Sequence, residues 1–478
     1  MKNNSGLLRA AIVWFVISAF CSLLFSGSSS SVHSVLILFT TISYALCVYT
    51  WVKSGCRLVS VYVFFVVYAF VCNCAQSLLY VFGVPYEYLT SYWNLSVEGV
   101  TYAFRFQLLC VAALNLGTCL ALTQRGNNVS TAEMVSWYES KQKKEDKLDK
   151  YLFPFLIICL LGSLFAAFEI ARVRSSMSYQ EWMYGGHNDV ETRFYFSYFY
   201  AFVSLRYVFK KQHTLLIYAS WSFFIGLFMM LGLRTQAIPY ITFFLITLPV
   251  TNSNLFKKKL IPIWIVGAFF FVIFLGIISS TRTEGSVDLS QSGNESTAVS
   301  FYVALADVGA SAETIGLTMN ECDKGMPHYQ SILYSIITVI PRRVLKLPEE
   351  LFQMSGWQAM SSPGSFMSHK VGLLGFGFSY IAEAYLNYGW FGWIFILIYG
   401  FGIARLENMA YQDIMKGYFF KITFLLWLAK QVFFARADLC LGENYIEYMV
   451  FTAILYKLFG SKEKLFTMGR KSIAALNK

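Results

Sequence analysis

Apolar runs of roughly 17–25 residues recur along almost the whole chain, and each can cross the ~30 Å hydrocarbon core of a bilayer as a helix. Only 14% of the 478 residues are charged, whereas ordinary soluble domains have about a quarter. Because a bilayer core offers no water to backbone N–H and C=O groups, these runs must be helical. We therefore predict an all-α polytopic membrane protein, one integral membrane domain over 1–478, with about twelve transmembrane helices. The predicted helices cover 7–25, 32–51, 58–82, 106–122, 151–168, 194–209, 215–232, 237–250, 260–279, 389–404, 418–434 and 445–459.

The distribution of lysine and arginine predicts the orientation of these helices. If the N-terminus is cytoplasmic and the helices alternate, about 25 of the 38 Lys and Arg residues fall inside, as the positive-inside rule requires. Both termini are then cytoplasmic, and the net charge of +11 indicates topology rather than nucleic-acid binding. The charged segment 124–150 becomes a cytoplasmic loop with a short amphipathic helix. Its Glu145, Asp146 and Asp149 alternate with lysines, which indicates a solvated face.

A polar stretch, 281–370, interrupts the apolar pattern and should lie on the outer side of the membrane. It forms most of a large external insert, 280–388. Two amphipathic parts of it, 298–319 and 329–345, are predicted as helices lying at the membrane surface. A large polar insert with cationic side chains at the bilayer surface suggests chemistry on an anionic molecule.

The nearly uncharged segment 371–404 would be about 51 Å long as a continuous helix, too long for one span and too short for two with a turn. A full span at 371–388 would put the basic C-terminal tail outside, against the charge rule. We therefore predict a half-depth or surface helix over 371–388 and the true span over 389–404. This arrangement places Glu383 at the wall of an outward-opening cavity, because half-depth backbone needs protein or water around it.

Several arginines lie on or near the predicted outer side, where a guanidinium fork suits phosphate oxygens. One interpretation is a clamp for a diphosphate, and the other is contact with lipid headgroups. Arg234, in a short turn between two predicted helices, and Arg436, also at a helix end, are the better candidates. Arg342 and Arg343, after Pro341, come next. The full set is Arg172, Arg174, Arg193, Arg234, Arg282, Arg342, Arg343 and Arg436.

Glu383 is the carboxylate best suited to chemistry, because it is the only charge between Lys370 and Arg405. A carboxylate in apolar surroundings binds a proton readily, which suits a general base acting on a hydroxyl group. Asn387 lies one turn later on the same helical face. The alternative for Glu383 is a buried carboxylate paired with an arginine.

Other titratable residues offer weaker candidates. His369 or His328, the histidines of the insert, are alternative bases. Lys430 and Glu447, within predicted helices, form either a buried ion pair or part of a substrate path.

Motifs for metals and nucleotides are missing from the sequence, so we expect no metal and no cofactor. There is no Walker loop, no HExxH and no Asp-x-Asp pair, and the nearest pattern is Glu321-Cys322-Asp323. The ten cysteines have no metal-ligand spacing and behave as small apolar side chains.

The stretch Ile381-Ala-Glu-Ala-Tyr-Leu-Asn-Tyr-Gly-Trp-Phe-Gly392 resembles the E-x-Y-x-N-(F/Y)-G-x-x-G pattern of Wzy-type oligosaccharide repeat-unit polymerases, which make O-antigen and capsule in bacterial inner membranes. The turn Leu231-Gly-Leu-Arg-Thr-Gln236 is similar to one in that family, which often keeps an arginine there. The order of parts is also similar: a long external insert with Pro341-Arg342-Arg343, then the Glu/Asn/Gly motif, then three spans. Together these likenesses cover the C-terminal half of the chain.

The resemblance implies a metal-independent glycosyltransferase that moves a growing glycan from its polyprenyl-diphosphate carrier to a new lipid-linked repeat unit. Glu383, or His369 in its place, would deprotonate the acceptor, and Asn387 would orient Glu383 or bind sugar. Besides the lipid-linked substrates, partners would be the bilayer and a chain-length regulator or other assembly proteins. The residues expected to bind the diphosphate charge are Arg234, Arg282, Arg342, Arg343 and Arg436.

Three alternatives remain open from the sequence. An O-antigen ligase uses similar glycans on the outer face and passes them to lipid A–core. A repeat-unit flippase or other secondary transporter would show internal symmetry, and the sequence has no repeat at any period. A scaffold of a polysaccharide assembly complex would need no arginines in a cavity.

Overall fold

The structure is a computed structural model, and it describes residues 5–25, 29–85, 89–123, 128–140, 147–175, 195–230, 234–252, 302, 305–306, 308–323, 331, 378–416, 425, 428–429 and 431–436. All regular secondary structure in these ranges is helical, with no strand among them. The prediction of an all-α protein is therefore confirmed for this part of the chain.

Most of the predicted spans coincide with helices of the structure. Each predicted span from 7–25 through 237–250 overlaps a described helix, and so does the predicted span at 389–404. The helices are α1 (Ser5–Leu24), α2 (Ser30–Lys53), α3 (Val61–Val81), α4 (Thr90–Thr123), α6 (Lys147–Ser175), α9 (Tyr195–Phe209), α10 (Thr214–Met230), α11 (Arg234–Thr251) and α20 (Gly392–Met415). Two predicted spans, 260–279 and 445–459, and most of 418–434 lie outside the described residues.

Six candidates among the described helices are long and apolar enough to cross a membrane: α1, α2, α3, Asn94–Thr123 of α4, Asp149–Val173 of α6, and Tyr380–Met415. Helices α9, α10 and α11 are apolar but contribute shorter stretches. The chain is thus a multi-pass membrane protein.

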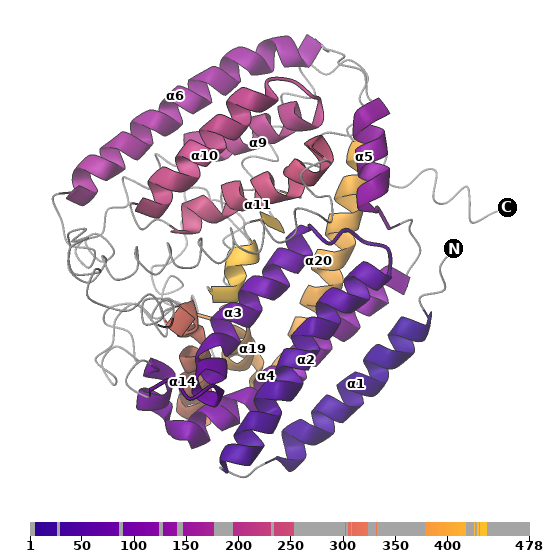
Figure 1. Ribbon diagram of the computed structural model, residues 1–478, viewed down its shortest axis with the longest axis vertical. Helices are drawn as coiled ribbons and strands as arrows, with labels where there is room; N and C mark the ends of the chain where they lie inside the picture. Colours follow the sequence, from indigo (N-terminus) through magenta and orange to yellow (C-terminus); the bar gives the residue numbers. More distant parts are fainter. Residues whose placement is uncertain are drawn as a thin grey trace.

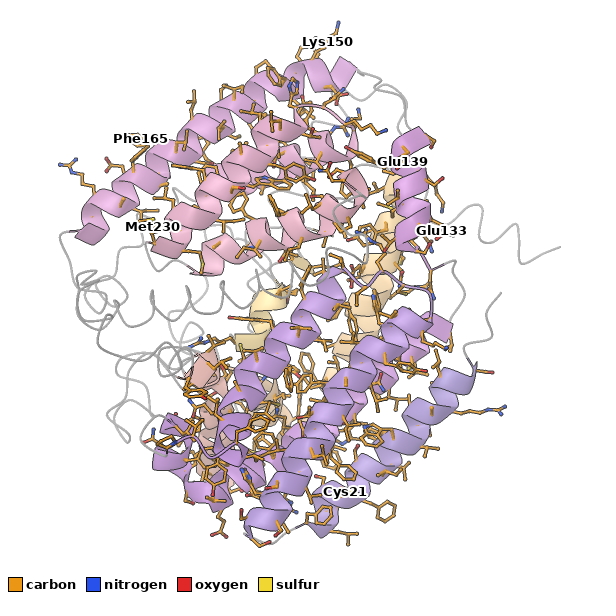
Figure 2. The ribbon with its side chains drawn as sticks, in the orientation of Figure 1. Cys21, Glu133, Glu139, Lys150, Phe165 and Met230 are labelled. Carbon is orange, nitrogen blue, oxygen red and sulfur yellow. The ribbon has the colours of Figure 1, made fainter. Side chains whose placement is uncertain are left out.

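The described helices form two groups (Figure 1). Helices α1 to α4 and α20 pack together around α4, whose apolar stretch has 89% of its residues buried, against 17% for α1 and 33% for α6. Helices α6, α9, α10 and α11 make up the second group. The exposed faces of α1 and α6 carry large apolar side chains such as Phe20 on α1. On α6 an example is Phe165, labelled in Figure 2. Since water would disfavour so much apolar surface, these faces suit contact with lipid.

Close approach of α4 and α20 depends on Gly117. A Cβ atom there would lie 2.0 Å from the carbonyl oxygen of Leu397, so only glycine fits. The adjacent Thr118 hydroxyl donates a hydrogen bond to the carbonyl of Leu114 at 2.9 Å. Small residues at helix crossings in membranes allow such backbone contact.

The end of α20 near α5 holds a buried carboxylate, Glu407. It accepts hydrogen bonds from the backbone N–H groups of Val61 at 2.9 Å and Tyr62 at 2.8 Å, which would otherwise be unpaired at the N-terminus of α3. The Arg57 guanidinium packs over the Tyr411 ring and donates to the carbonyl of Ile246 in α11 at 2.7 Å. These contacts join the two groups of helices.

The predicted short helix of the 124–150 segment is α5 (Thr131–Ser140). The prediction of a solvated acidic face in this segment is wrong for Asp149, which is only 3% exposed. Its carboxylate pairs with Arg206 of α9 at 3.2 Å and with Lys210, in the turn that directly follows α9, at 2.6 Å. A buried charge needs partners, and here they come from about sixty residues away in the sequence. Glu145 and Asp146 lie outside the described residues.

Replacing Asp149 with alanine is expected to lower the free energy of unfolding by about 3–5 kcal/mol, because two buried cations lose their counter-charge. The matched control is Asp413→Ala, which removes a half-exposed pair with Lys416 at 3.9 Å and should cost less than about 1 kcal/mol. Thermal unfolding of the detergent-purified proteins measures both. Equal midpoints for the two variants would contradict the burial of this charge cluster.

Part of the stretch 298–319, predicted as a helix at the membrane surface, belongs to helix α14 (Ser311–Asp323). The residues of α14 over 311–319 are buried, and the helix packs against α4, α19 and α3. Its Thr314 and Thr318 hydroxyls donate to carbonyls of their own helix at 2.8 and 2.6 Å, so these two buried hydroxyls need no water. Of the second stretch, 329–345, the structure describes Ser331 alone.

Helix α19 (Tyr380–Tyr388) is followed by the 3₁₀ turn η7 (Gly389–Phe391) and then by α20. The predicted break at the start of the 389–404 span is therefore confirmed. The span is longer than predicted, because α20 continues to Met415.

Candidate functional site

The Glu/Asn/Gly motif occupies α19 and the turn after it. The Ser379 hydroxyl caps the helix by accepting from the N–H of Ile381, and it donates to the Asn73 side chain of α3 at 3.0 Å. Tyr380 then meets the Tyr44 hydroxyl of α2 at 3.1 Å. All residues over 380–386 are buried. The motif helix is thus fixed inside the bundle on several sides.

The two glycines of the motif are required by the turn from α19 into α20. Gly389 has φ of 55° and ψ of −139°, a conformation that residues with a side chain rarely adopt. At Gly392 a Cβ atom would lie 2.4 Å from the carbonyl oxygen of Ala384. These positions fold the start of α20 tightly against α19.

Glu383 has no exposed surface, and its carboxylate accepts a hydrogen bond from the Ser331 hydroxyl at 2.7 Å. The Asn387 amide donates to the same Ser331 oxygen at 2.7 Å and to the Glu383 backbone carbonyl at 2.8 Å. The prediction that Asn387 and Glu383 share one helical face is confirmed. Ser331 completes this group, which we call the Glu383 cluster.

Tyr385, also in the motif, points to a second carboxylate. Its hydroxyl donates to Asp323 at 2.8 Å, and the Tyr102 hydroxyl of α4 donates to the other oxygen of Asp323 at 2.8 Å. Asp323 therefore joins α14 to both the motif helix and α4. Burial raises the pKa of the preceding Cys322 thiol to about 11, which disfavours the reactive thiolate form. The structure shows no metal-binding group of His, Cys, Asp or Glu among its described residues.

A cavity of about 400 Å³ lies against Tyr102, between α4 and α14. Arg105 lines it, with its guanidinium 5.6 Å from the Tyr102 ring and 5.7 Å from the Trp390 ring of the motif turn. Its Nε donates to the carbonyl of Ser22 at 2.7 Å. The cavity is lined by Phe25, Leu95, Ser96, Glu98, Gly99, Thr101, Tyr102, Arg105 and Asn320.

The expectation that Glu383 lines an outward-opening cavity is not met at this cavity. Glu383 is absent from its lining, and the motif helix reaches the cavity wall through Tyr385 and Asp323 instead. The physical reason is packing: Ser331 and the neighbouring helices cover the Glu383 side chain completely.

The predicted arginines are only partly described. Arg234 is the first residue of α11, and Arg436 is the last residue of the 3₁₀ helix η9 (Val432–Arg436), so both lie at helix ends as expected. Arg172 is exposed on α6. The side chain of Arg234 and the whole of Arg193, Arg282, Arg342, Arg343, His328, His369, Lys430 and Glu447 lie outside the described residues.

Three polar residues of this region were not identified from the sequence as site residues. They are Ser331, Arg105 and Asp323, which bridges two tyrosines. Arg105 carried a signal, because it directly precedes the apolar run predicted as a span at 106–122. The predicted span begins at residue 106, directly after Arg105, whereas helix α4 begins sixteen residues earlier, at Thr90. Arg105 therefore lies inside the helix and not in the loop before it.

The model of the O-antigen polysaccharide polymerase Wzy family matches residues 9–462, almost the whole chain. The chain belongs to this family. The likeness seen in the C-terminal half thus extends through the N-terminal helices of this Wzy protein. No curated protein and no solved structure gives a match.

Replacing Tyr385 with phenylalanine tests the link between the Wzy motif and α14. The ring contacts with Phe106 and Trp390 remain, but the hydrogen bond to Asp323 is lost, so we expect a cost of about 1–2 kcal/mol in unfolding free energy. Tyr388→Phe is the control, since Tyr388 is 46% exposed on the same helix and should change stability by less than about 0.5 kcal/mol. Thermal unfolding in detergent measures both, and indistinguishable midpoints would rule out a stabilising Asp323 bridge.

Proposed function

We propose that this Wzy protein joins oligosaccharide repeat units at the periplasmic face of the bacterial inner membrane. It transfers a growing glycan from a polyprenyl-diphosphate carrier to the non-reducing end of a new lipid-linked repeat unit. Family membership supports polymerase activity. The observation that carries the mechanism is the Glu383 cluster, in which a serine and an asparagine orient the buried carboxylate of the motif.

The expected orientation of α1 supports a periplasmic location for the site. With the N-terminus cytoplasmic, as the positive-inside rule favours, the C-terminal end of α1 faces the periplasm. Ser22, near that end, exchanges hydrogen bonds with Arg105 of the cavity at 2.7 and 2.8 Å. Helices α14 and α19 lie at this end of the bundle, and α5 lies at the other (Figure 1). The motif and the cavity would therefore meet the periplasmic glycan.

In the proposed reaction Glu383 takes the proton of the acceptor hydroxyl as that oxygen attacks the anomeric carbon of the donor glycan. The bond from that carbon to the diphosphate oxygen breaks, and the polyprenyl diphosphate leaves with the bonding electrons. Ser331 and Asn387 hold the carboxylate in place. Because Glu383 is fully covered, its uncovering is a step of this reaction. His369 is the second candidate for the base.

Charge developing on the leaving diphosphate requires cationic donors. We assign this role to arginines, whose planar forks bind phosphate oxygens without a metal. Arg234 and Arg436 are the first candidates, since helix ends hold their backbones in place. The other candidates are Arg282, Arg342 and Arg343.

The experiment is a surface-polysaccharide gel of a strain lacking this gene, complemented with the wild type or with Arg234→Ala. We expect the deletion to reduce the ladder to core plus one repeat unit, with the wild type restoring it and the variant failing at normal protein level. Loss of all attached repeat units, with polymer on the carrier lipid, would instead indicate a ligase. Repeat units trapped on the cytoplasmic face would indicate a flippase, and an unchanged ladder would exclude glycan assembly.

A further inference from the structure

The cavity against Tyr102 has one wall built from a single face of α4. Glu98, Tyr102 and Arg105 follow each other at spacings of four and three residues, which aligns them along the helix. Asn320 of α14 lines the opposite side. A volume of about 400 Å³ falls within the range of small-ligand sites, about 300–1,000 Å³.

The polar groups of this wall are available to a ligand. Glu98 and Asn320 are exposed, and their side chains have no hydrogen-bond or ion-pair partner among the described residues. Within the part of the chain that the structure describes, the Arg105 side chain donates one hydrogen bond, from Nε to the carbonyl of Ser22. Both terminal nitrogens of the guanidinium are therefore left to donate to a ligand. The cavity therefore presents amide groups, a carboxylate acceptor and guanidinium donors.

The aromatic side of the cavity is fixed in place. Tyr102 is tied by its hydroxyl to Asp323, and the Trp390 ring packs against Tyr102 at 5.9 Å between centroids. A sugar ring has an apolar C–H face, which suits an aromatic wall, and hydroxyl groups that both donate and accept hydrogen bonds. Donors and acceptors placed together beside aromatic rings match this chemistry.

The charges of the lining favour a neutral ligand over an anion. Arg105 alone would attract phosphate, but Glu98 lies on the same wall and opposes a second negative charge. The backbone at Ser96, with φ of 60° and ψ of 172°, also lines the cavity in a conformation rare for residues other than glycine. Strain of this kind clusters at functional sites.

We propose that this cavity binds a neutral sugar residue of the glycan that the protein extends. The assignment of the glycan rests on the proposed polymerase function. Asp323 connects the site to the motif, because the same carboxylate holds Tyr102 of the cavity and Tyr385 of α19. A sugar in the cavity would thus lie next to the motif helix, where the glycan must be held for transfer.

The test uses the full-length protein in detergent and, as probe, the O-polysaccharide of the host strain released by mild acid, which carries neither lipid nor diphosphate. Saturation-transfer NMR and titration calorimetry measure binding. Glu98→Gln and Asn320→Ala should each weaken binding about tenfold or more, since the first replaces a charged acceptor of sugar hydroxyls with a weaker neutral one and the second removes an amide contact. Glu139→Gln, an exposed carboxylate on α5, is the matched control and should bind as the wild type does (Figure 2).

Millimolar inorganic diphosphate should leave the bound polysaccharide in place. Displacement by diphosphate, wild-type affinity in both cavity variants, or no binding to the wild type would each overturn the proposal. Failure of the sugar site can be distinguished from failure of the proposed function. A normal ladder from the deletion strain refutes polymerisation. Wild-type binding by the cavity variants, with a ladder that depends on the gene, refutes only the sugar site.

Discussion

Replacing Glu383 with glutamine is expected to abolish polymer formation while the protein stays folded in the membrane. The glutamine side chain has nearly the same shape, and its carbonyl can still accept the Ser331 hydrogen bond. Its neutral amide cannot take a proton from the acceptor hydroxyl. Loss of a general base typically lowers the rate by about 10²–10⁴-fold. The ladder of the complemented deletion strain, with an immunoblot of membranes, measures activity and protein level together.

The control for this experiment is Glu139→Gln, which neutralises an exposed carboxylate on α5 and should give the wild-type ladder. A wild-type ladder from Glu383→Gln would exclude Glu383 as the base. His369→Asn would then be the next variant to test, because His369 is the second candidate for the base.

Replacing Gly392 with alanine is expected to destabilise the motif region and abolish the ladder. The added methyl group would lie 2.4 Å from the Ala384 carbonyl oxygen, which is backbone and cannot rotate away. Helices α19 and α20 must then separate, and overpacking of this kind costs about 1–3 kcal/mol or more. The shift would also move Glu383 and Tyr385, which lie on the displaced helix. Thermal unfolding and the ladder gel measure the two effects.

Gly402→Ala gives the matched comparison for this change, because it alters the same helix and has no atom within 4 Å of the new Cβ. It should be neutral or stabilising by up to about 1 kcal/mol, since alanine favours helix more than glycine does. Similar behaviour of the two variants would contradict the close contact at Gly392.

Hydropathy predicted most of the described helices, because membrane helices follow directly from apolar length. The break at Gly389 was predicted from the positive-inside rule, under which only that division keeps the basic C-terminal tail inside. The long N-terminal extension of α4 did not follow, because Glu98 and Arg105 interrupt its apolar pattern. Arg105 is tolerated there through its hydrogen bond to Ser22, which comes from another helix.

The site was predictable only where its residues are close in sequence. Glu383 and Asn387 are one turn apart on one helix, so their proximity followed from helical geometry. Ser331 and Asp323 lie 52 and 62 residues from their partners in the motif, and one sequence contains no signal for such pairs. The same limit explains Asp149, whose cationic partners Arg206 and Lys210 lie 57 and 61 residues away in the sequence.

The most direct test of polymerase activity is to place the purified protein in liposomes with polyprenyl-diphosphate-linked repeat units and a metal chelator. We predict glycans of several repeat units attached to the carrier lipid, together with released polyprenyl diphosphate, for the wild type but not for Glu383→Gln. Repeat units that remain single with folded wild-type protein, or polymer that forms only after divalent metal is restored, would contradict metal-independent polymerisation.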